Sequence, residues 1–327
     1  MGLPKYPYPV DEDIDFRDFT PQVRVYNQEL QKEIVKRLQR FLEDEEKQDA
    51  LNHVLIATLG SDARLEKGPK STMELMVYHK GYSDINALVL ALHEFTAERE
   101  EKEGKKLFSA VEVKDTSLDR LSLYQNREGR VFPGRVIEGR PLLGKEDLFD
   151  TAVRTVCSEF TTSRTAKSYF DALKTQKRMG RKRMLVGSNM IHGEQAVHYN
   201  LKEGCAYYDG NTRGSFKYGP IRFLQAALLV DLMRYARAFP KKGPVFIAEM
   251  PSNIADRLAY IETNRVSNLT SEQTRDLANC YQYFLLRYHQ SQARYNRGLS
   301  VTEFDRAEVK ERIGAIDKIV KDPIIKI

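Results

Sequence analysis

The sequence predicts an α+β fold, in which a small mixed-sheet α/β domain is followed by an all-helical domain. Strand-like apolar runs alternate with a helix between residues 50 and 113, whereas helical periodicity dominates beyond Lys145. The charge also divides, because residues 1–150 hold 23 basic and 29 acidic side chains and residues 151–327 hold 29 and 17. We therefore expect three parts: an N-terminal segment and helix at 1–49, the α/β domain at 50–145 and a basic helical domain at 146–327.

The first half of the chain begins with a segment rich in Pro and Asp, residues 1–20, which we expect to be irregular. A helix is predicted from Pro21 to about Asp49, where apolar residues recur at helical spacing. The apolar run His53–Leu59 is typical of a buried strand, and it ends in the turn residues Gly60 and Ser61. Further on, we expect a second strand at 73–78, a helix at 84–103 and a third strand at 107–113.

The second half carries helical patterns at roughly 146–178, 218–238, 252–263, 271–298 and 303–320. The pattern at 271–298 is the clearest. Thr270 and Gln273 stand at its start with the spacing of a capping box, in which each residue hydrogen-bonds the backbone of the other.

The segment between the first two predicted strands has residue types that suit phosphate binding. A Gly60-Ser61 turn lets backbone N–H groups approach a phosphate, and Ser61 adds a hydroxyl. Glu74 follows at the start of the second strand, and Glu112 lies between two valines on the third. Carboxylates that converge beside a triphosphate can hold Mg²⁺ for phosphoryl or nucleotidyl transfer.

This segment resembles the nucleotidyltransferase superfamily of the DNA polymerase beta type. More narrowly, it is similar to the branch of the nitrogen-signalling protein uridylyltransferases and related nucleotidyltransferases, with the motif Gly-[Gly/Ser]-x-x-Arg-x-Glu-x-x-x-x-Ser-Asp-x-Asp. Five residues fall on motif positions without a gap: Gly60, Ser61, Arg64, Glu66 and Ser71. Glu112 matches the third acidic position of the family on the downstream strand.

Two later segments extend the resemblance to roughly residues 50–240. Residues 132–144 look like the segment that ends the catalytic domain, and residues 216–225 are similar to a Lys-x-Gly…Arg element that opens a helix. The resemblance implies a nucleotidyltransferase-like α/β domain that moves a nucleoside monophosphate from an NTP to an acceptor, with a protein side chain as one candidate. Gly60, Ser61, Arg64, Ser71, Lys217 and Arg222 would bind the nucleotide, and Glu74 and Glu112 would be the catalytic ligands of Mg²⁺ or Mn²⁺.

The sequence departs from the family at the metal-binding aspartates, which correspond to Thr72 and Glu74. Threonine supplies no anionic ligand, and glutamate is one methylene longer than aspartate, so both changes weaken a site that demands octahedral geometry. The alternative to an active enzyme is therefore a catalytically impaired protein of the same fold that binds a nucleotide or a partner protein in a regulatory role.

Simpler interpretations remain open for several of these residues. Arg64 and Glu66 could form a solvated loop pair, and Glu112 could face water. The run Lys174–Arg183 holds six basic residues in ten and is typical of a solvated helix end. Nucleic acid, an acidic protein or nucleotide phosphates are its alternative partners, and nucleic acid is the less favoured function for the chain as a whole.

The composition and the absence of certain motifs in the sequence argue against several classes of protein. Hydrophobic residues at 41% and charged residues at 30% indicate a globular chain, and the longest apolar run is far too short to cross a membrane. The N-terminus has no apolar core of a signal peptide, and the three cysteines are widely spaced, so we expect a reducing, cytoplasmic location. No zinc-ligand spacing and no Gly-Lys-Ser/Thr phosphate loop occur.

Overall fold

The computed structural model describes residues 6, 14–68, 73–102, 111–118, 132–162, 164–186, 205–209, 212–296 and 306–327. These fall into two compact units, and each is described by itself. The first unit comprises Met1–Pro7, Val23–Thr165 and Pro240–Ser252, and the second comprises Tyr8–Gln22, Ala166–Phe239 and Asn253–Ile327. The helix that follows the boundary expected at 145, α5 (Asp147–Thr162), belongs to the first unit.

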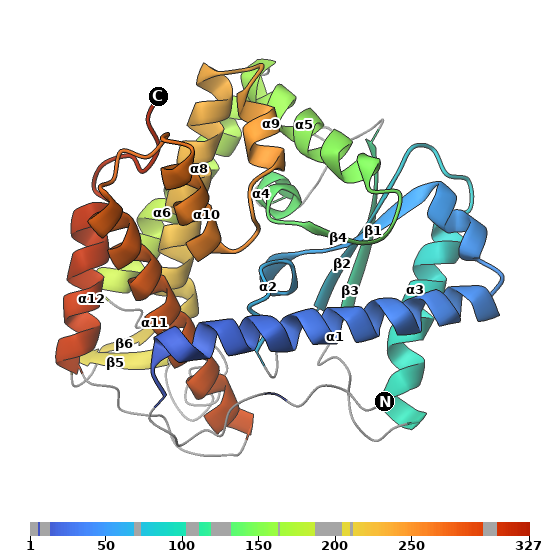
Figure 1. Ribbon diagram of the computed structural model, residues 1–327, viewed down its shortest axis with the longest axis horizontal. Helices are drawn as coiled ribbons and strands as arrows, with labels where there is room; N and C mark the ends of the chain where they lie inside the picture. Colours follow the sequence, from blue (N-terminus) through green and yellow to red (C-terminus); the bar gives the residue numbers. More distant parts are fainter. Residues whose placement is uncertain are drawn as a thin grey trace. The chain divides into compact units, whose positions relative to one another are not determined.

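The first unit is built on a four-stranded mixed sheet with the order β3-β2-β1-β4 (Figure 1). Its strands are β1 (Val54–Thr58), β2 (Met73–His79), β3 (Val111–Ser117) and β4 (Arg140–Gly144). Strand β1 is antiparallel to β2 and to β4, and β2 is parallel to β3. Helix α3 (Ile85–Lys102) connects the two parallel strands, as a parallel pair requires a crossover. The small mixed sheet of the predicted α+β fold is therefore confirmed.

Helices cover both faces of this sheet. Helices α1 (Phe16–Asp44) and α3 share one hydrophobic core with alternate residues of the strands. Its buried members are Leu30, Ile34, Leu38, Leu42, Ala50, Val54, Ile56, Met73, Leu75, Val77, Leu88, Leu92, Phe95 and Val113. On the opposite face, Phe149 of α5 meets the ring of Tyr78 edge-on at 6.2 Å between centroids. Short helices complete the unit: η1 (Gln48–Asn52), α2 (Gly60–Ala63), α4 (Phe132–Ile137) and α9 (Gly243–Ala248).

Three elements differ from the sequence prediction: α1, β4 and β3. Helix α1 begins at Phe16 and runs through Pro21, because the Asp15 carboxylate accepts the Arg17 N–H at 2.8 Å and caps a start upstream of the proline. Strand β4 was not predicted, since Pro141 interrupts its short apolar run. A proline is tolerated there because β4 is the edge strand beside β1. Strand β3 begins at Val111, and residues 107–110 of the expected strand lie outside the described residues.

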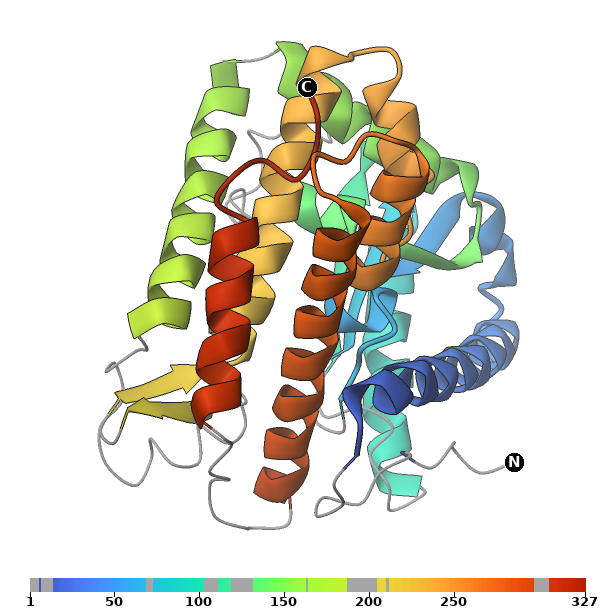
Figure 2. The ribbon, with the colours of Figure 1, turned by 60° about the vertical axis from the view of Figure 1, so that its left-hand side comes forward.

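The second unit contains long helices that lie side by side in Figure 2, among them α6 (Arg164–Val186), α8 (Arg222–Ala238), α11 (Ser271–Asn296) and α12 (Arg306–Ile319). Helix α10 (Ile254–Thr263) begins at an Asn253 cap, and the π-helical turn η3 (Lys217–Ile221) precedes α8. The capping box of α11 is confirmed, since Thr270 N–H donates to Gln273 Oε1 at 3.0 Å and Gln273 N–H to Thr270 Oγ1 at 3.2 Å.

The expectation of an all-helical second domain is wrong. Strands β5 (Cys205–Asp209) and β6 (Thr212–Ser215) pair as an antiparallel hairpin. The sequence carries the relevant signal, because Gly210-Asn211, the pair between the two strands, is favoured in two-residue hairpin turns and comes soon after the aromatic pair Tyr207-Tyr208. The helix expected over 146–178 is also two helices, α5 and α6, and α6 continues to Val186.

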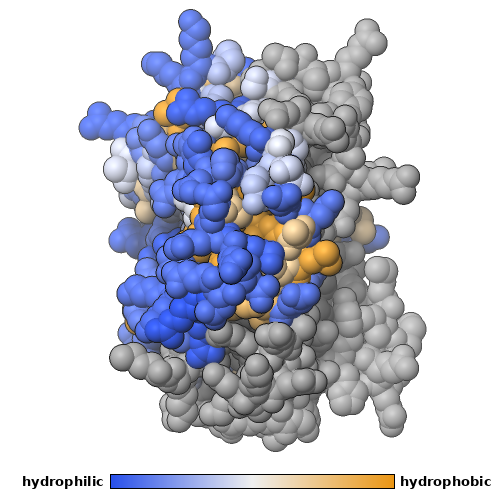
Figure 3. All heavy atoms as spheres, turned by 90° about the vertical axis from the view of Figure 1, so that its right-hand side faces the viewer, coloured by the Kyte–Doolittle hydropathy of each residue, from blue (hydrophilic) through white to orange (hydrophobic). Residues whose placement is uncertain are grey.

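Among the atoms that Figure 3 colours by hydropathy, hydrophilic residues predominate, and hydrophobic residues gather near the centre of the view and in smaller spots above it. Isolated apolar side chains are usual on protein surfaces, and Leu90 on α3, which is 63% exposed, is one of them. Within the described ranges, every helix is too short or too polar to span a bilayer.

Two free thiols are buried, and we expect them to be unreactive in the folded protein. Burial raises the pKa of Cys157 to about 12 and that of Cys280 to about 11. Since the thiolate is the nucleophile, a rise of about three units lowers the reactive fraction of Cys157 about a thousandfold at neutral pH. Mass spectrometry of maleimide-treated Cys205→Ser protein should find these thiols labelled only after denaturant is added. Rapid labelling under native conditions would contradict their burial.

Candidate functional site

The predicted phosphate turn follows strand β1 in the structure. Leu59 leads from β1 into α2, and Gly60 takes a φ of 62°, in the left-handed region that favours glycine. The Leu59 N–H donates to the Glu74 carbonyl oxygen at 3.0 Å, which ties the turn to the start of β2. Gly60 and Ser61 are half-buried, so the turn is held by the sheet while its backbone remains within reach of solvent.

The Glu74 carboxylate lies beside this turn. A Cβ atom placed on Gly60 would be 3.6 Å from Glu74 Oε2. Glu74 is half-buried, in contrast to the buried Met73 and Leu75 on either side of it. Strand alternation therefore directs its side chain away from the core that those two residues enter. The structure thus brings together three predicted site residues, Gly60, Ser61 and Glu74.

Gly60→Ala tests the geometry of the turn. The added methyl group has room, because the nearest atom, Glu74 Oε2, is 3.6 Å away. The expected loss of stability therefore comes from the left-handed backbone conformation alone. That conformation costs an L-residue about 1–2 kcal/mol, which we expect as the fall in unfolding free energy in a urea titration. A change below about 0.5 kcal/mol would show that the backbone of Gly60 relaxes out of this region.

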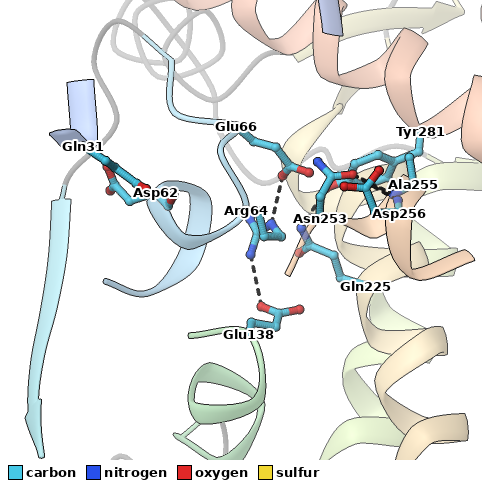
Figure 4. A network of polar contacts seen from close by, with 10 residues as sticks. All are labelled: Gln31, Asp62, Arg64, Glu66, Glu138, Gln225, Asn253, Ala255, Asp256 and Tyr281. Atoms are coloured by element: carbon cyan, nitrogen blue, oxygen red, sulfur yellow. Dashed lines mark hydrogen bonds and ion pairs between the residues drawn. The ribbon is translucent and has the colours of Figure 1, made fainter. Parts of the chain in front are cut away.

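Arg64 forms ion pairs with two carboxylates of the first unit. Its Nε lies 2.8 Å from Glu66 Oε2 and its Nη1 lies 3.0 Å from Glu138 Oε2, just past helix α4 (Figure 4). The side chains of Arg64, Glu66 and Glu138 are 11, 3 and 14% exposed. The pair of Arg64 and Glu66 is therefore buried, which excludes the interpretation as a solvated loop pair. These two ion pairs connect the predicted phosphate turn to the end of α4.

A second buried polar cluster anchors the turn to α1. Lys67 Nζ lies 3.2 Å from Asp62 Oδ1, and the two residues are 5 and 2% exposed. Gln31 donates to the Asp62 carbonyl oxygen at 2.7 Å, and Asn27 donates to the Lys67 carbonyl oxygen at 3.3 Å. Burial raises the pKa of Asp62, nearby Lys67 opposes that rise, and the charge of Glu74 adds to it. Sequence reasoning did not identify this pairing.

The other predicted site residues are not assembled with the turn by the described structure. Glu112 pairs with Glu74 in the parallel register of β3 and β2, but its side chain is outside the described residues, as are Ser71 and Thr72. Lys217 and Arg222 belong to the second unit. Lys217 Nζ lies 5.9 Å from the centroid of the Tyr288 ring, and the side chain of Arg222 at the start of α8 is exposed.

The carboxylates near the turn could take part in holding a metal ion that is bound to a nucleotide. In the part of the chain that the structure describes, no three His, Cys, Asp or Glu side chains form a metal-binding group. Mg²⁺ in nucleotide sites is usually held by one or two carboxylates together with the substrate phosphates and water. Glu74 could supply one such carboxylate, and Glu112, which is in register with it on the neighbouring strand, could supply a second.

No protein-family model matches the chain, and no curated protein matches it. The resemblance to nucleotidyltransferases consequently rests on the motif residues themselves.

Proposed function

We propose that the first unit binds a nucleoside triphosphate at the Gly60-Ser61 turn and transfers its nucleoside monophosphate to an acceptor. The proximity of the Glu74 carboxylate to Gly60 carries this proposal. It puts a metal-binding group next to backbone N–H groups that suit a phosphate. The order of elements also supports it, because an antiparallel β1–β2 pair encloses the turn and a parallel β3 brings Glu112 into register with Glu74.

In this reaction an acceptor oxygen forms a bond to the α-phosphorus, the bond from that phosphorus to the bridging oxygen breaks, and pyrophosphate leaves. The acceptor proton passes to solvent. The Mg²⁺ or Mn²⁺ ion that accompanies the nucleotide would neutralise phosphate charge. Ser61 and the turn backbone would hold the terminal phosphates, and Glu74 would orient the metal with them. Arg64 was expected to bind phosphate, and its ion pairs with Glu66 and Glu138 support a role in fixing the turn as well.

Glu74→Gln is expected to reduce the rate of nucleotidyl transfer by at least about a hundredfold. The substitution removes the charge of a metal ligand and keeps the shape of the side chain. The assay follows transfer of label from α-labelled ATP, UTP, GTP or CTP with Mg²⁺ or Mn²⁺ into protein or other acceptors. Glu94→Gln on α3 is the matched control, because Glu94 is exposed in the same unit. Undiminished transfer by Glu74→Gln would overturn the role of Glu74.

A second candidate function is nucleotide binding without transfer. Thr72 favours it, because the family has a metal-binding aspartate at that position and threonine offers no charge. Calorimetric titration with an NTP and Mg²⁺, combined with the transfer assay, distinguishes the two. Binding without turnover supports this candidate, and a gain of transfer in Thr72→Asp would identify the missing carboxylate as its cause. Absence of nucleotide binding would overturn both functions.

A further inference from the structure

Helix α6 of the second unit carries the strongest basic run of the sequence, and one side of the helix is packed against its own unit. Leu173 and Met184 are 1 and 0% exposed. Gly180 lies so close to α8 that a Cβ atom on it would be 3.0 Å from the Phe223 Cα. This close backbone approach fixes the rotation of α6 about its axis, so the opposite face is directed away from α8.

Two cations of the run take part in interactions within the unit. Arg181 forms a bidentate pair with Asp317 of α12, with distances of 2.5 and 2.9 Å. Lys177 is half-buried near Asp231 of α8; burial lowers the pKa of Lys177, and the charge of Asp231 opposes that change. Both residues therefore have a structural explanation.

Three other cations of the run have no such structural explanation, and the side chain of the sixth, Arg183, lies outside the described residues. Lys174, Arg178 and Lys182 are exposed, and within the described residues none of the three forms an ion pair. They recur every four residues, so they form one stripe with about 6 Å of helix between neighbours. Like charges at this spacing destabilise a helix by a few tenths of a kcal/mol per pair. The nearest acid on the helix is Asp171, and residues 172–186 contain no acid at all.

We infer that this stripe, Lys174, Arg178 and Lys182, binds the phosphate backbone of a nucleic acid. Regularly spaced cations on a rigid helix match a regularly charged polymer, and their affinity comes from release of condensed counterions. An acidic protein is the less suitable partner, because lysine is depleted at protein interfaces and the stripe has no aromatic anchor. Recognition is independent of the nucleotide sequence, since the stripe presents charges to the phosphate backbone and no set of side chains that would hydrogen-bond base edges.

The experiment measures binding of a short fluorescent DNA duplex to the full chain by anisotropy, over a salt series from about 50 to 200 mM. In the triple variant Lys174→Gln, Arg178→Gln and Lys182→Gln, affinity at low salt should fall and the slope of log K against log salt should become less steep by about 3, close to one for each cation. Circular dichroism verifies that the helix content is kept.

The chain offers a matched control on α1. Lys32, Lys36 and Arg40 are exposed at the same spacing, but that helix also carries Glu29, which lies 2.8 Å from Lys32 Nζ. Their triple Gln variant should keep the wild-type slope to within about one unit. The proposal is overturned if the wild type does not bind the duplex at low salt, if both triple variants lose binding equally, or if polyglutamate of matched length binds the stripe as tightly as the duplex.

Discussion

Replacing Lys67 with Met is expected to lower the free energy of unfolding by about 3–5 kcal/mol, because the substitution leaves the Asp62 carboxylate buried without its cation. Asp62 is 2% exposed, and within the described residues its Oδ2 atom has no hydrogen-bond partner, so the protein offers the carboxylate little compensation for the lost cation. Urea titration monitored by circular dichroism measures the change. The matched control is Lys32→Met, whose pair with Glu29 is exposed and should contribute less than about 1 kcal/mol.

Adding Asp62→Asn to Lys67→Met should recover most of that loss. A buried ion pair is expensive to break on one side, but its replacement by two neutral groups is often close to neutral in stability. The double variant is therefore expected within about 2 kcal/mol of the wild type, well below the sum of the losses in the two single variants; the difference between that sum and the loss in the double variant is the coupling energy. A loss below about 1 kcal/mol in Lys67→Met alone would mean that the folded protein does not rely on this pair.

The local geometry explains why the sequence did not predict the Asp62–Lys67 pair. Leu65 lies between the two residues and takes a φ of 58°, a conformation unusual for a branched side chain. The Glu66 N–H then donates to the Ser61 carbonyl oxygen at 2.8 Å, and the chain turns back on itself. No residue type in the segment signals this reversal. Likewise, the Arg64–Glu138 contact joins residues 74 apart in the chain, which only the folded sheet brings together.

Elements with a strong periodic or capping signal were predictable. Helix α11 begins at Ser271, where the Thr270–Gln273 capping box predicts it, and β1 falls within the apolar run that ends at Gly60. Strand β4 was missed because it depends on long-range pairing with β1 that its short run does not reveal, whereas the β5–β6 hairpin was missed although its pairing is local and its turn signal is present in the sequence. For the candidate site, the position of Glu74 beside the turn follows from strand pairing, whereas its role in binding a metal stays a prediction.

Asp231→Ala is expected to destabilise the second unit by about 3 kcal/mol. Asp231 is 0% exposed, and its Oδ2 accepts the Ile324 N–H at 2.6 Å, so the variant leaves a buried N–H without an acceptor. It also removes the charge that faces Lys177 and Arg234. Because Ile324 and Ile325 are buried in the C-terminal segment, we also expect faster trimming of that segment by carboxypeptidase.

Asp317→Ala provides the control within the same unit. Asp317 pairs with Arg181, but that arginine side chain is 53% exposed, so its loss should change stability by no more than about 1 kcal/mol. Equal effects of the two substitutions would contradict a special role for Asp231 in holding the C-terminal segment.

The pH dependence of Asp231→Asn gives a second, independent measurement. Burial raises the pKa of Asp231 above its ordinary value of 3.8, and the backbone N–H of Ile324 and nearby cations oppose that rise only in part. A raised pKa in the folded state means that this group's stabilisation is present below about pH 4 and is lost as the pH rises through the folded pKa. Asparagine does not titrate. The stability of the wild type relative to Asp231→Asn should therefore decline from about pH 4 upward, by at most about 1.4 kcal/mol per pH unit. A relative stability that stays constant over this range would mean that the folded pKa of Asp231 equals its unfolded pKa, and a rise would mean that the folded pKa is the lower one; either result contradicts the prediction.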